Sequence, residues 1–122
     1  MNIILVDNNL VFLKSLEMLL RARGHCVVTF SDPVIAIQQN GLIHWDNDEA
    51  PIYLVDYLMP HLNGVELYNQ TRNQPHAKYG MLTGHFETVT QELKNRDYSS
   101  LTLFSKPVDL NQIFNFIENG AA

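Results

Sequence analysis

Five apolar runs of strand length recur along the chain, and helix-like stretches separate them. The runs are Asn2–Val6, Cys26–Phe30, Ile52–Val55, Tyr79–Leu82 and Leu101–Phe104. Continuous apolar strands that are joined by crossover helices are typical of a parallel sheet covered on both faces. With right-handed crossovers, five such units predict a doubly wound α/β fold with the strand order 2-1-3-4-5.

The stretches between these runs have the residue spacing of amphipathic helices. In the first stretch the apolar residues at helical spacing are Phe12, Leu13, Leu16, Leu19 and Leu20. Ser31–Asp32–Pro33 predicts the start of a second helix that ends near Gln39. Asn40–Ala50 lacks a clear period and predicts a long loop or a frayed helix end. The third helix is expected to follow Gly64 and to stop at Asn73–Gln74–Pro75, the fourth to cover roughly Phe86–Arg96, and the last to begin near Asp109. In the fourth helix, Glu92 is predicted to face outward.

The size and composition of the chain limit the classes of protein to which it can belong. Its 122 residues predict one domain. A net charge of −5 without a basic block argues against direct nucleic-acid binding. No apolar segment approaches the roughly 18 residues of a membrane span, and the apolar start stops at Asp7, so a cytoplasmic protein without a signal peptide is expected. Cys26 is the only cysteine and is predicted to be a buried thiol.

Polar side chains follow four of the five predicted strands. They are Asp7 and Asn8, Asp56, Thr83, and Lys106. Because parallel strands present their carboxyl ends at one edge of a sheet, these residues are expected to be neighbours there, with Asp56 at the rim and outside the core. Two adjacent carboxylates require a compensating cation, which Lys106 supplies in part and a bound divalent metal supplies in full. Oxygen ligands favour Mg²⁺.

Each of these residues also has an ordinary structural explanation when it is taken alone. An Asp or Thr at the end of a strand commonly caps a loop, and a lone lysine is commonly a solvated surface residue. In the loop, His44, Asp46 and Asp48 alternate with other residues, but nothing fixes a fourth metal ligand nearby, so a solvated acidic loop is favoured. The argument for a site therefore depends on the strand-end residues acting together.

Taken together, these motifs resemble the receiver domain of two-component response regulators along essentially the whole chain. The motifs are Val6–Asp7–Asn8, Asp56–Tyr57–Leu58–Met59–Pro60 with Gly64, Thr83–Gly84, and Ser105–Lys106–Pro107. The resemblance implies one receiver domain over residues 1–122 with the flavodoxin-like (βα)5 fold. It also implies a role in phosphorelay signal transduction.

The resemblance assigns a role to each strand-end residue. Asp56 would take a phosphoryl group from a sensor histidine kinase or a histidine phosphotransfer protein and form an aspartyl phosphate. Thr83 and Lys106 would contact the phosphoryl oxygens. Mg²⁺ would be held by Asp7, Asn8, Asp56 and the backbone carbonyl of Leu58. The chain would catalyse its own phosphorylation and slow dephosphorylation, without turning over a conventional substrate.

The resemblance also implies an output. Phosphorylation would rearrange the face formed by the fourth helix, the fifth strand and the fifth helix, and so favour a downstream effector or a homodimer. The implied partners are proteins, with no direct contact to nucleic acid or membrane.

Two departures from the family pattern keep an alternative open. Asn8 stands where the family generally carries a second acid, and Leu103 stands where it usually has Tyr or Phe, with Phe104 on the opposite face of the strand. The alternative is a degenerate receiver that works as a phosphorylation-independent protein-interaction module. A flavin- or nucleotide-binding protein would need a Gly- or Ser/Thr-rich phosphate loop after the first strand, and the acidic run Asp7–Asn8–Asn9–Leu10 argues against it.

Overall fold

The computed structural model describes residues 1–94 and 97–119, which form a five-stranded parallel sheet in the order β2-β1-β3-β4-β5. The strands are β1 (Asn2–Val6), β2 (Cys26–Phe30), β3 (Ile52–Asp56), β4 (Lys78–Thr83) and β5 (Leu101–Ser105). The helices are α1 (Leu10–Ala22), α2 (Pro33–Gln39), α3 (Gly64–Thr71), α4 (Phe86–Leu93) and α5 (Leu110–Glu118). The predicted fold class and strand order are confirmed.

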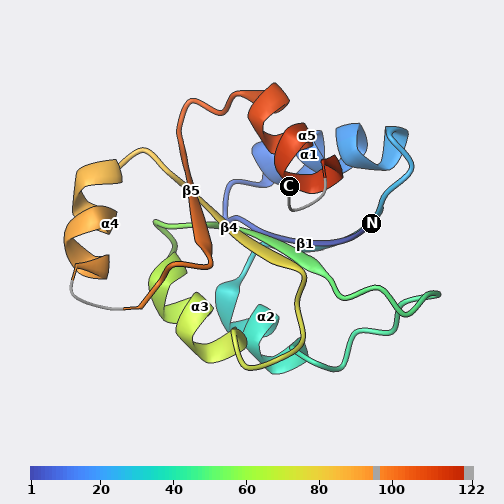
Figure 1. Cartoon of the computed structure of the whole chain (residues 1–122), viewed down its shortest axis with the longest axis horizontal. Coiled ribbons are helices and arrows are strands. Elements are labelled where there is room, and N and C mark those ends of the chain that lie inside the picture. Colours follow the sequence, from blue (N-terminus) through green and yellow to red (C-terminus); the bar gives the residue numbers. More distant parts are fainter. Residues whose placement is uncertain (95–96, 120–122) are drawn as a thin grey trace.

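The helices cover both faces of the sheet and form one hydrophobic core on each side. Figure 1 shows α1 and α5 on one face and α2 and α3 on the other, with α4 beside β5. Leu13 and Leu16 of α1 pack with Ile113 of α5 in one core, and Val65 of α3 packs with Val89 of α4 in the other. The strands between them, apart from the two edge strands, are almost wholly buried. This sandwich is what the continuous apolar strands predict.

Side-chain caps set the start of most helices. Asn9 accepts a hydrogen bond from the Phe12 N–H at the start of α1, and Asp32 caps α2, in which proline takes the first position. At α3 the Asn63 side chain accepts from the Glu66 N–H while the Glu66 carboxylate accepts from the Asn63 N–H, which is a capping box. Each cap satisfies a backbone donor that the first turn leaves free.

Two sequence predictions about the fold need correction or restriction. Cys26 is exposed, because it opens an edge strand at the end where the sheet meets solvent, and the predicted buried thiol is wrong. The helix α4 ends at Leu93, and part of the predicted extension to Arg96 lies outside the described residues. Within the described ranges 1–94 and 97–119, none of the helices is long and apolar enough to cross a membrane.

The end of α5 is tied to the chain after α1 by a small ionic cluster. The Arg23 Nε donates to Glu118 Oε2 at 2.6 Å, and His25 Nε2 lies 2.8 Å from the same oxygen. The hydrogen bonds from Arg23 and then His25 lower the pKa of Glu118 to about 2. This carboxylate therefore stays charged well into the acid range.

We expect Glu118→Gln to lower the stability of the protein at pH 7 and to have less effect in acid. A lowered pKa contributes stability that is fully present above the unfolded value of about 4.3 and is lost as the pH falls through about 2. Urea denaturation of both proteins between pH 7 and pH 2 measures the difference, with Glu87→Gln as the control. A difference that stays constant over this range would contradict the prediction.

Candidate functional site

Three of the predicted strand-end side chains meet at the carboxyl edge of the sheet. Asp7 follows β1 and Asp56 ends β3, which are neighbouring strands that pair Val6 with Val55. The Lys106 Nζ, just beyond β5, lies 3.0 Å from Asp56 Oδ1 and 3.3 Å from Asp7 Oδ2. One ammonium group therefore compensates two carboxylates, and the predicted convergence of these three side chains is observed.

The two carboxylates are more buried than the sequence suggests. Asp56 lies at the end of its strand as predicted, but it is 6% exposed and Asp7 is 3% exposed, so the expectation that Asp56 lies outside the buried part of the protein is wrong. The physical reason is that β3 is the central strand of the sheet, with β1 and β4 on either side. Burial raises the pKa of Asp56, the hydrogen bond from Lys106 opposes this, and the nearby charge of Asp7 adds to the rise. The result is a carboxylate with an elevated proton affinity.

Lys106 is held in place by several contacts. Its backbone N–H donates to the Thr83 carbonyl at 2.8 Å, and its Nζ lies 5.0 Å from the centre of the Phe12 ring. Burial of the ammonium acts to lower the pKa of Lys106, but the hydrogen bonds and charges of Asp56 and Asp7 outweigh it and the pKa is raised. The side chain is therefore a fixed positive charge at neutral pH.

Asn8 directly follows Asp7 in the chain, Leu58 lies two residues after Asp56, and both residues are exposed. The Asp7 Oδ1 accepts a hydrogen bond from the Asn9 N–H at 2.8 Å, which turns the other oxygen of Asp7 toward Lys106. The Asn8 side chain is exposed, and within the described residues it bonds to none of the three charged groups. Leu58 is 61% exposed, and no donor from the described part of the chain reaches its backbone carbonyl. Neither the Asn8 side-chain oxygen nor the Leu58 carbonyl oxygen is therefore used by a hydrogen bond from another described residue.

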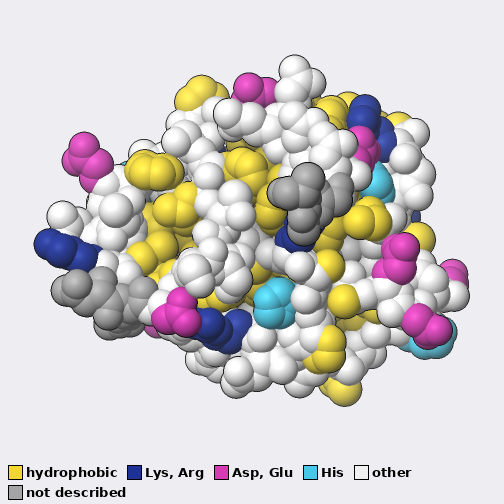
Figure 2. Space-filling model, in the orientation of Figure 1, with side chains coloured by type: hydrophobic (Ala, Val, Ile, Leu, Met, Phe, Trp, Pro, Cys, Tyr) yellow, Lys and Arg dark blue, Asp and Glu magenta, His cyan; other side chains and the backbone are white. Residues whose placement is uncertain are grey.

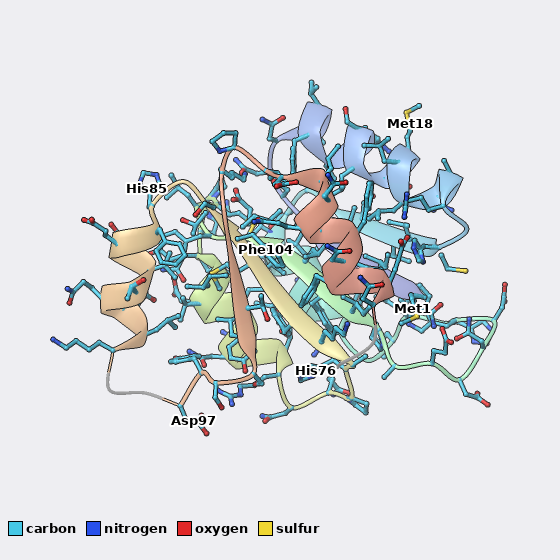
Figure 3. All side chains as sticks on the ribbon, turned by 45° about the horizontal axis from the view of Figure 1, so that its top comes forward. Met1, Met18, His76, His85, Asp97 and Phe104 are labelled. Atoms are coloured by element: carbon cyan, nitrogen blue, oxygen red, sulfur yellow. The ribbon has the colours of Figure 1, made fainter. Side chains whose placement is uncertain are left out.

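Thr83 ends β4, the strand next to Asp56. Its hydroxyl oxygen accepts a hydrogen bond from the His85 N–H at 2.7 Å, so the hydroxyl proton is available for donation. Figure 3 places His85 on the loop that leads from β4 into α4. In the described ranges, the Thr83 hydroxyl does not bond to Asp7, Asp56 or Lys106, and only its backbone carbonyl connects it to the cluster. The structure therefore brings Thr83 to the same edge without joining its hydroxyl to the charged groups.

The structure shows a contact, not predicted from the sequence, that joins α4 to the loop after β3. The Tyr57 hydroxyl donates to Glu92 Oε1 at 2.7 Å, and the Asn63 Nδ2 lies 3.3 Å from the same oxygen. Burial and the hydrogen bond to Glu92 raise the pKa of Tyr57 to about 12. Spacing along a helix places Glu92 on the outer side, but spacing carries no information about a loop that packs beside the helix end. No signal in the sequence identifies this partner.

The two residues before the end of β5 face opposite sides of the sheet, as predicted. Leu103 packs against the core that contains Val89 of α4. Phe104, labelled in Figure 3, belongs to the core on the α1 and α5 side, and its ring centre lies 5.1 Å from that of Phe116. The aromatic ring of β5 therefore does not face α4.

The donor set at the sheet edge fits a small divalent cation. Asp7 and Asp56 carry two charges against one on Lys106, and the Leu58 carbonyl and the Asn8 amide add neutral oxygens. Within the described residues no three His, Cys, Asp or Glu side chains form a metal site. Mg²⁺ is commonly held by only one or two carboxylates together with water and phosphate oxygens, so two carboxylates are sufficient for it.

Solved structures of receiver domains share the fold. The receiver domain of the hybrid histidine kinase CckA matches with a TM-score of 0.70 and 20% identity over 97% of this chain and 96% of that chain. The Francisella response regulator 1452 receiver domain gives a TM-score of 0.72 and 14% identity over 95% and 92%. Full-length FixJ from B. japonicum gives 0.74 and 21% over 96% of this chain and 55% of that one.

Family membership follows from a second comparison. No curated protein matches the chain significantly. The family model for the response regulator receiver domain matches residues 3–118, which include all of the strand-end residues described above. A match over nearly the whole chain agrees with the strand order and with the cluster of two carboxylates and one lysine at the edge of the sheet. The protein therefore belongs to the response regulator receiver domain family of two-component systems.

Proposed function

We propose that Asp56 accepts a phosphoryl group from a sensor histidine kinase or a histidine phosphotransfer protein. The observation that carries this proposal is the buried Asp56 carboxylate, which lies 3.0 Å from the Lys106 ammonium with Asp7 beside it. Two carboxylates held against one cation are costly for folding alone, and such costs concentrate at functional sites. We also place this exchange in the cytoplasm, the usual location of receiver domains.

In the proposed step, an oxygen of the Asp56 carboxylate forms a bond to phosphorus. The bond between phosphorus and the donor's imidazole nitrogen breaks, and that nitrogen keeps the electron pair. Lys106 moves from pairing with the carboxylate to pairing with a phosphoryl oxygen, and Thr83 donates its free hydroxyl proton to another. The product is an aspartyl phosphate, which water slowly hydrolyses.

Asp7, Asn8, Asp56 and the Leu58 carbonyl are the groups that would hold Mg²⁺ in this site. When bound, the ion supplies positive charge that stabilises the oxygens of the group in transfer. The chain's own contribution is to hold the carboxylates: the Asn9 N–H orients Asp7, and Lys106 orients both acids.

We expect Asn8→Asp to tighten the binding of Mg²⁺ by about tenfold. Two unit charges 4 Å apart interact by about 4 kcal/mol at an effective dielectric constant near 20, and desolvation cancels most of this gain. A calorimetric titration with MgCl2 at fixed ionic strength measures the change. The control is Asn111→Asp, which adds the same charge at an exposed position away from the site; Asn9→Asp is unsuitable because Asn9 caps α1. Equal affinities in the wild type and Asn8→Asp would refute the prediction.

A second candidate function is a phosphorylation-independent interaction module. Asn8 and the position of Leu103, with Phe104 turned away from α4, favour this candidate. The retained Asp56, Thr83 and Lys106 favour phosphoacceptance. In either case the partner is a protein, and we place the output on the face formed by α4, β5 and α5 with an effector or a second copy of the chain.

The two candidates are separated by incubation with acetyl phosphate and MgCl2 followed by intact-mass measurement. Phosphoacceptance predicts the gain of one phosphoryl group in the wild type and no gain in Asp56→Asn. If neither acetyl phosphate nor a phosphorylated histidine phosphotransfer protein produces an adduct, the interaction module becomes the favoured function.

A further inference from the structure

We infer that Glu92 is a positioning residue that couples α4 to the phosphoacceptor through Tyr57 and Asn63. The term Glu92 bridge is used below for the hydrogen bonds that the Glu92 carboxylate accepts from the Tyr57 hydroxyl and the Asn63 amide. The inference rests on the proposed phosphorylation of Asp56 and adds the contact by which the state of that residue reaches α4.

Tyr57 directly follows Asp56 in the chain and forms hydrogen bonds to three other elements. Its N–H donates to the Leu82 carbonyl of β4, and its carbonyl accepts from the Gly64 N–H at the start of α3. The residue is 7% exposed, and its hydroxyl reaches Glu92 of α4 at 2.7 Å. Because the residue is buried and its hydroxyl is hydrogen-bonded, a shift of its backbone also moves the hydroxyl. A displacement at Asp56 is therefore passed to all three elements.

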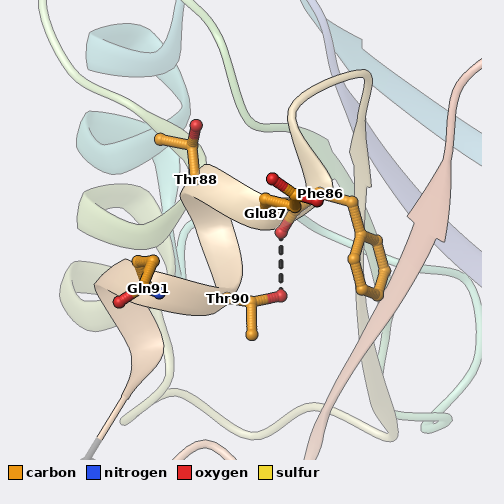
Figure 4. A pocket seen from close by; sticks show the side chains of 5 residues that line it. All are labelled: Phe86, Glu87, Thr88, Thr90 and Gln91. Atoms are coloured by element: carbon orange, nitrogen blue, oxygen red, sulfur yellow. Dashed lines mark hydrogen bonds between the residues drawn. The ribbon is translucent and has the colours of Figure 1, made fainter.

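Few other contacts hold α4. Val89 is its only fully buried residue among those described, and Leu93 packs partly buried against the same core. The first residue of the helix follows His85, which makes no side-chain cap. The opposite side of α4 is open to solvent and lines a shallow pocket, shown in Figure 4, where Phe86, Glu87 and Gln91 project outward. Figure 2 shows hydrophobic side chains at the surface between α4 and β5. With so little packing, the Glu92 bridge is a large share of what fixes the orientation of this helix.

The Glu92 bridge offers a route that does not need an aromatic residue at position 103. A phosphoryl group on Asp56 adds bulk and negative charge next to Tyr57, and we expect it to displace that residue and lengthen the bridge. The helix α4 is then freed, and its outer face changes for a partner. Coupling of this kind is reciprocal, so loss of the bridge must also change how readily Asp56 is phosphorylated.

The test compares amide hydrogen exchange of α4 with and without acetyl phosphate and MgCl2, while intact mass follows the adduct in the same samples. In the wild type we expect phosphorylation to speed the exchange of α4 amides. In Tyr57→Phe we expect α4 amides of the unphosphorylated protein to exchange about fivefold faster, because one hydrogen bond is lost. In this variant, the ratio of the α4 exchange rate in the phosphorylated protein to the rate in the unphosphorylated protein should fall to less than half of its wild-type value.

Two variants of glutamate distinguish coupling from a general loosening of the helix. Glu92→Gln keeps an oxygen that accepts from Tyr57 and should retain the wild-type ratio. Glu87→Ala removes an acid of the same helix that has no hydrogen bond or ion pair within the described residues, and should also retain it. If the phosphoryl adduct forms but Tyr57→Phe keeps the wild-type ratio, or Glu87→Ala loses as much of it as Tyr57→Phe does, the inference about the Glu92 bridge is wrong and the proposed function still holds. If the wild type gains no phosphoryl group, the proposed function fails and this inference fails with it.

Discussion

Replacing Lys106 with methionine is expected to slow the formation of the phosphoryl adduct by about a hundredfold or more. Removal of one preorganised donor from a site of charge transfer typically costs this much. Two effects act together here. The phosphoryl oxygens lose a fixed positive charge, and the Asp56 carboxylate loses the hydrogen bond from Lys106, which opposes the effect of burial and of Asp7 on its pKa.

The rate is measured from intact mass at a fixed concentration of acetyl phosphate and MgCl2. Lys14→Met is the matched control, because Lys14 lies exposed on α1 and pairs only with Glu17 among the described residues. Circular dichroism shows whether each variant is folded. A folded Lys106→Met protein that gains the phosphoryl group at the wild-type rate would contradict the assigned role of the lysine.

Replacing Gly64 with alanine is expected to lower the free energy of unfolding by about 3 kcal/mol. An added Cβ would lie 2.6 Å from the backbone oxygen of Asp56 and 3.0 Å from the Cα of Tyr57, and backbone atoms cannot move aside cheaply. The Gly64 N–H also donates to the Tyr57 carbonyl at 2.8 Å, so the first residue of α3 lies directly against the backbone at the end of β3. This glycine lets the chain at the start of α3 return close to the end of β3.

Urea denaturation of the two proteins measures this loss. Gly84→Ala is the matched control, because its added Cβ would meet only the Lys106 side chain at 4.0 Å, an ordinary contact. We expect that control to remain within about 0.5 kcal/mol of the wild type. A Gly64→Ala protein as stable as the control would show that the loop can relax and that the close approach does not require glycine.

The topology and the charged cluster could be predicted from the sequence because both follow from a few strong rules. Apolar strands of uniform length with helices between them predict a parallel sheet, and a parallel sheet brings Asp7, Asp56 and Lys106 to one edge whatever their separation in the chain. The one-residue offset of Leu103 and Phe104 was equally predictable, because alternate residues of a strand face opposite sides.

The predictions that were wrong concern features that depend on how the helices, strands and loops pack against one another. The burial of Asp56 reflects its place on the central strand and the neighbours that close around it. The partners of Glu92 come from a loop that lies about thirty residues earlier in the chain, and helical spacing alone gave the residue an outward position. Cys26 is exposed because β2 is an edge strand, although its apolar neighbours suggested a core residue.

The most direct test of the phosphoacceptor role is to locate the phosphoryl group in the chain. The protein is incubated with acetyl phosphate and MgCl2, treated with borohydride to reduce any aspartyl phosphate to homoserine, and then analysed by peptide mass mapping. We predict homoserine at position 56 in the wild type and none in Asp56→Asn. Homoserine at another aspartate, or an adduct of undiminished yield in Asp56→Asn, would contradict the assignment of Asp56.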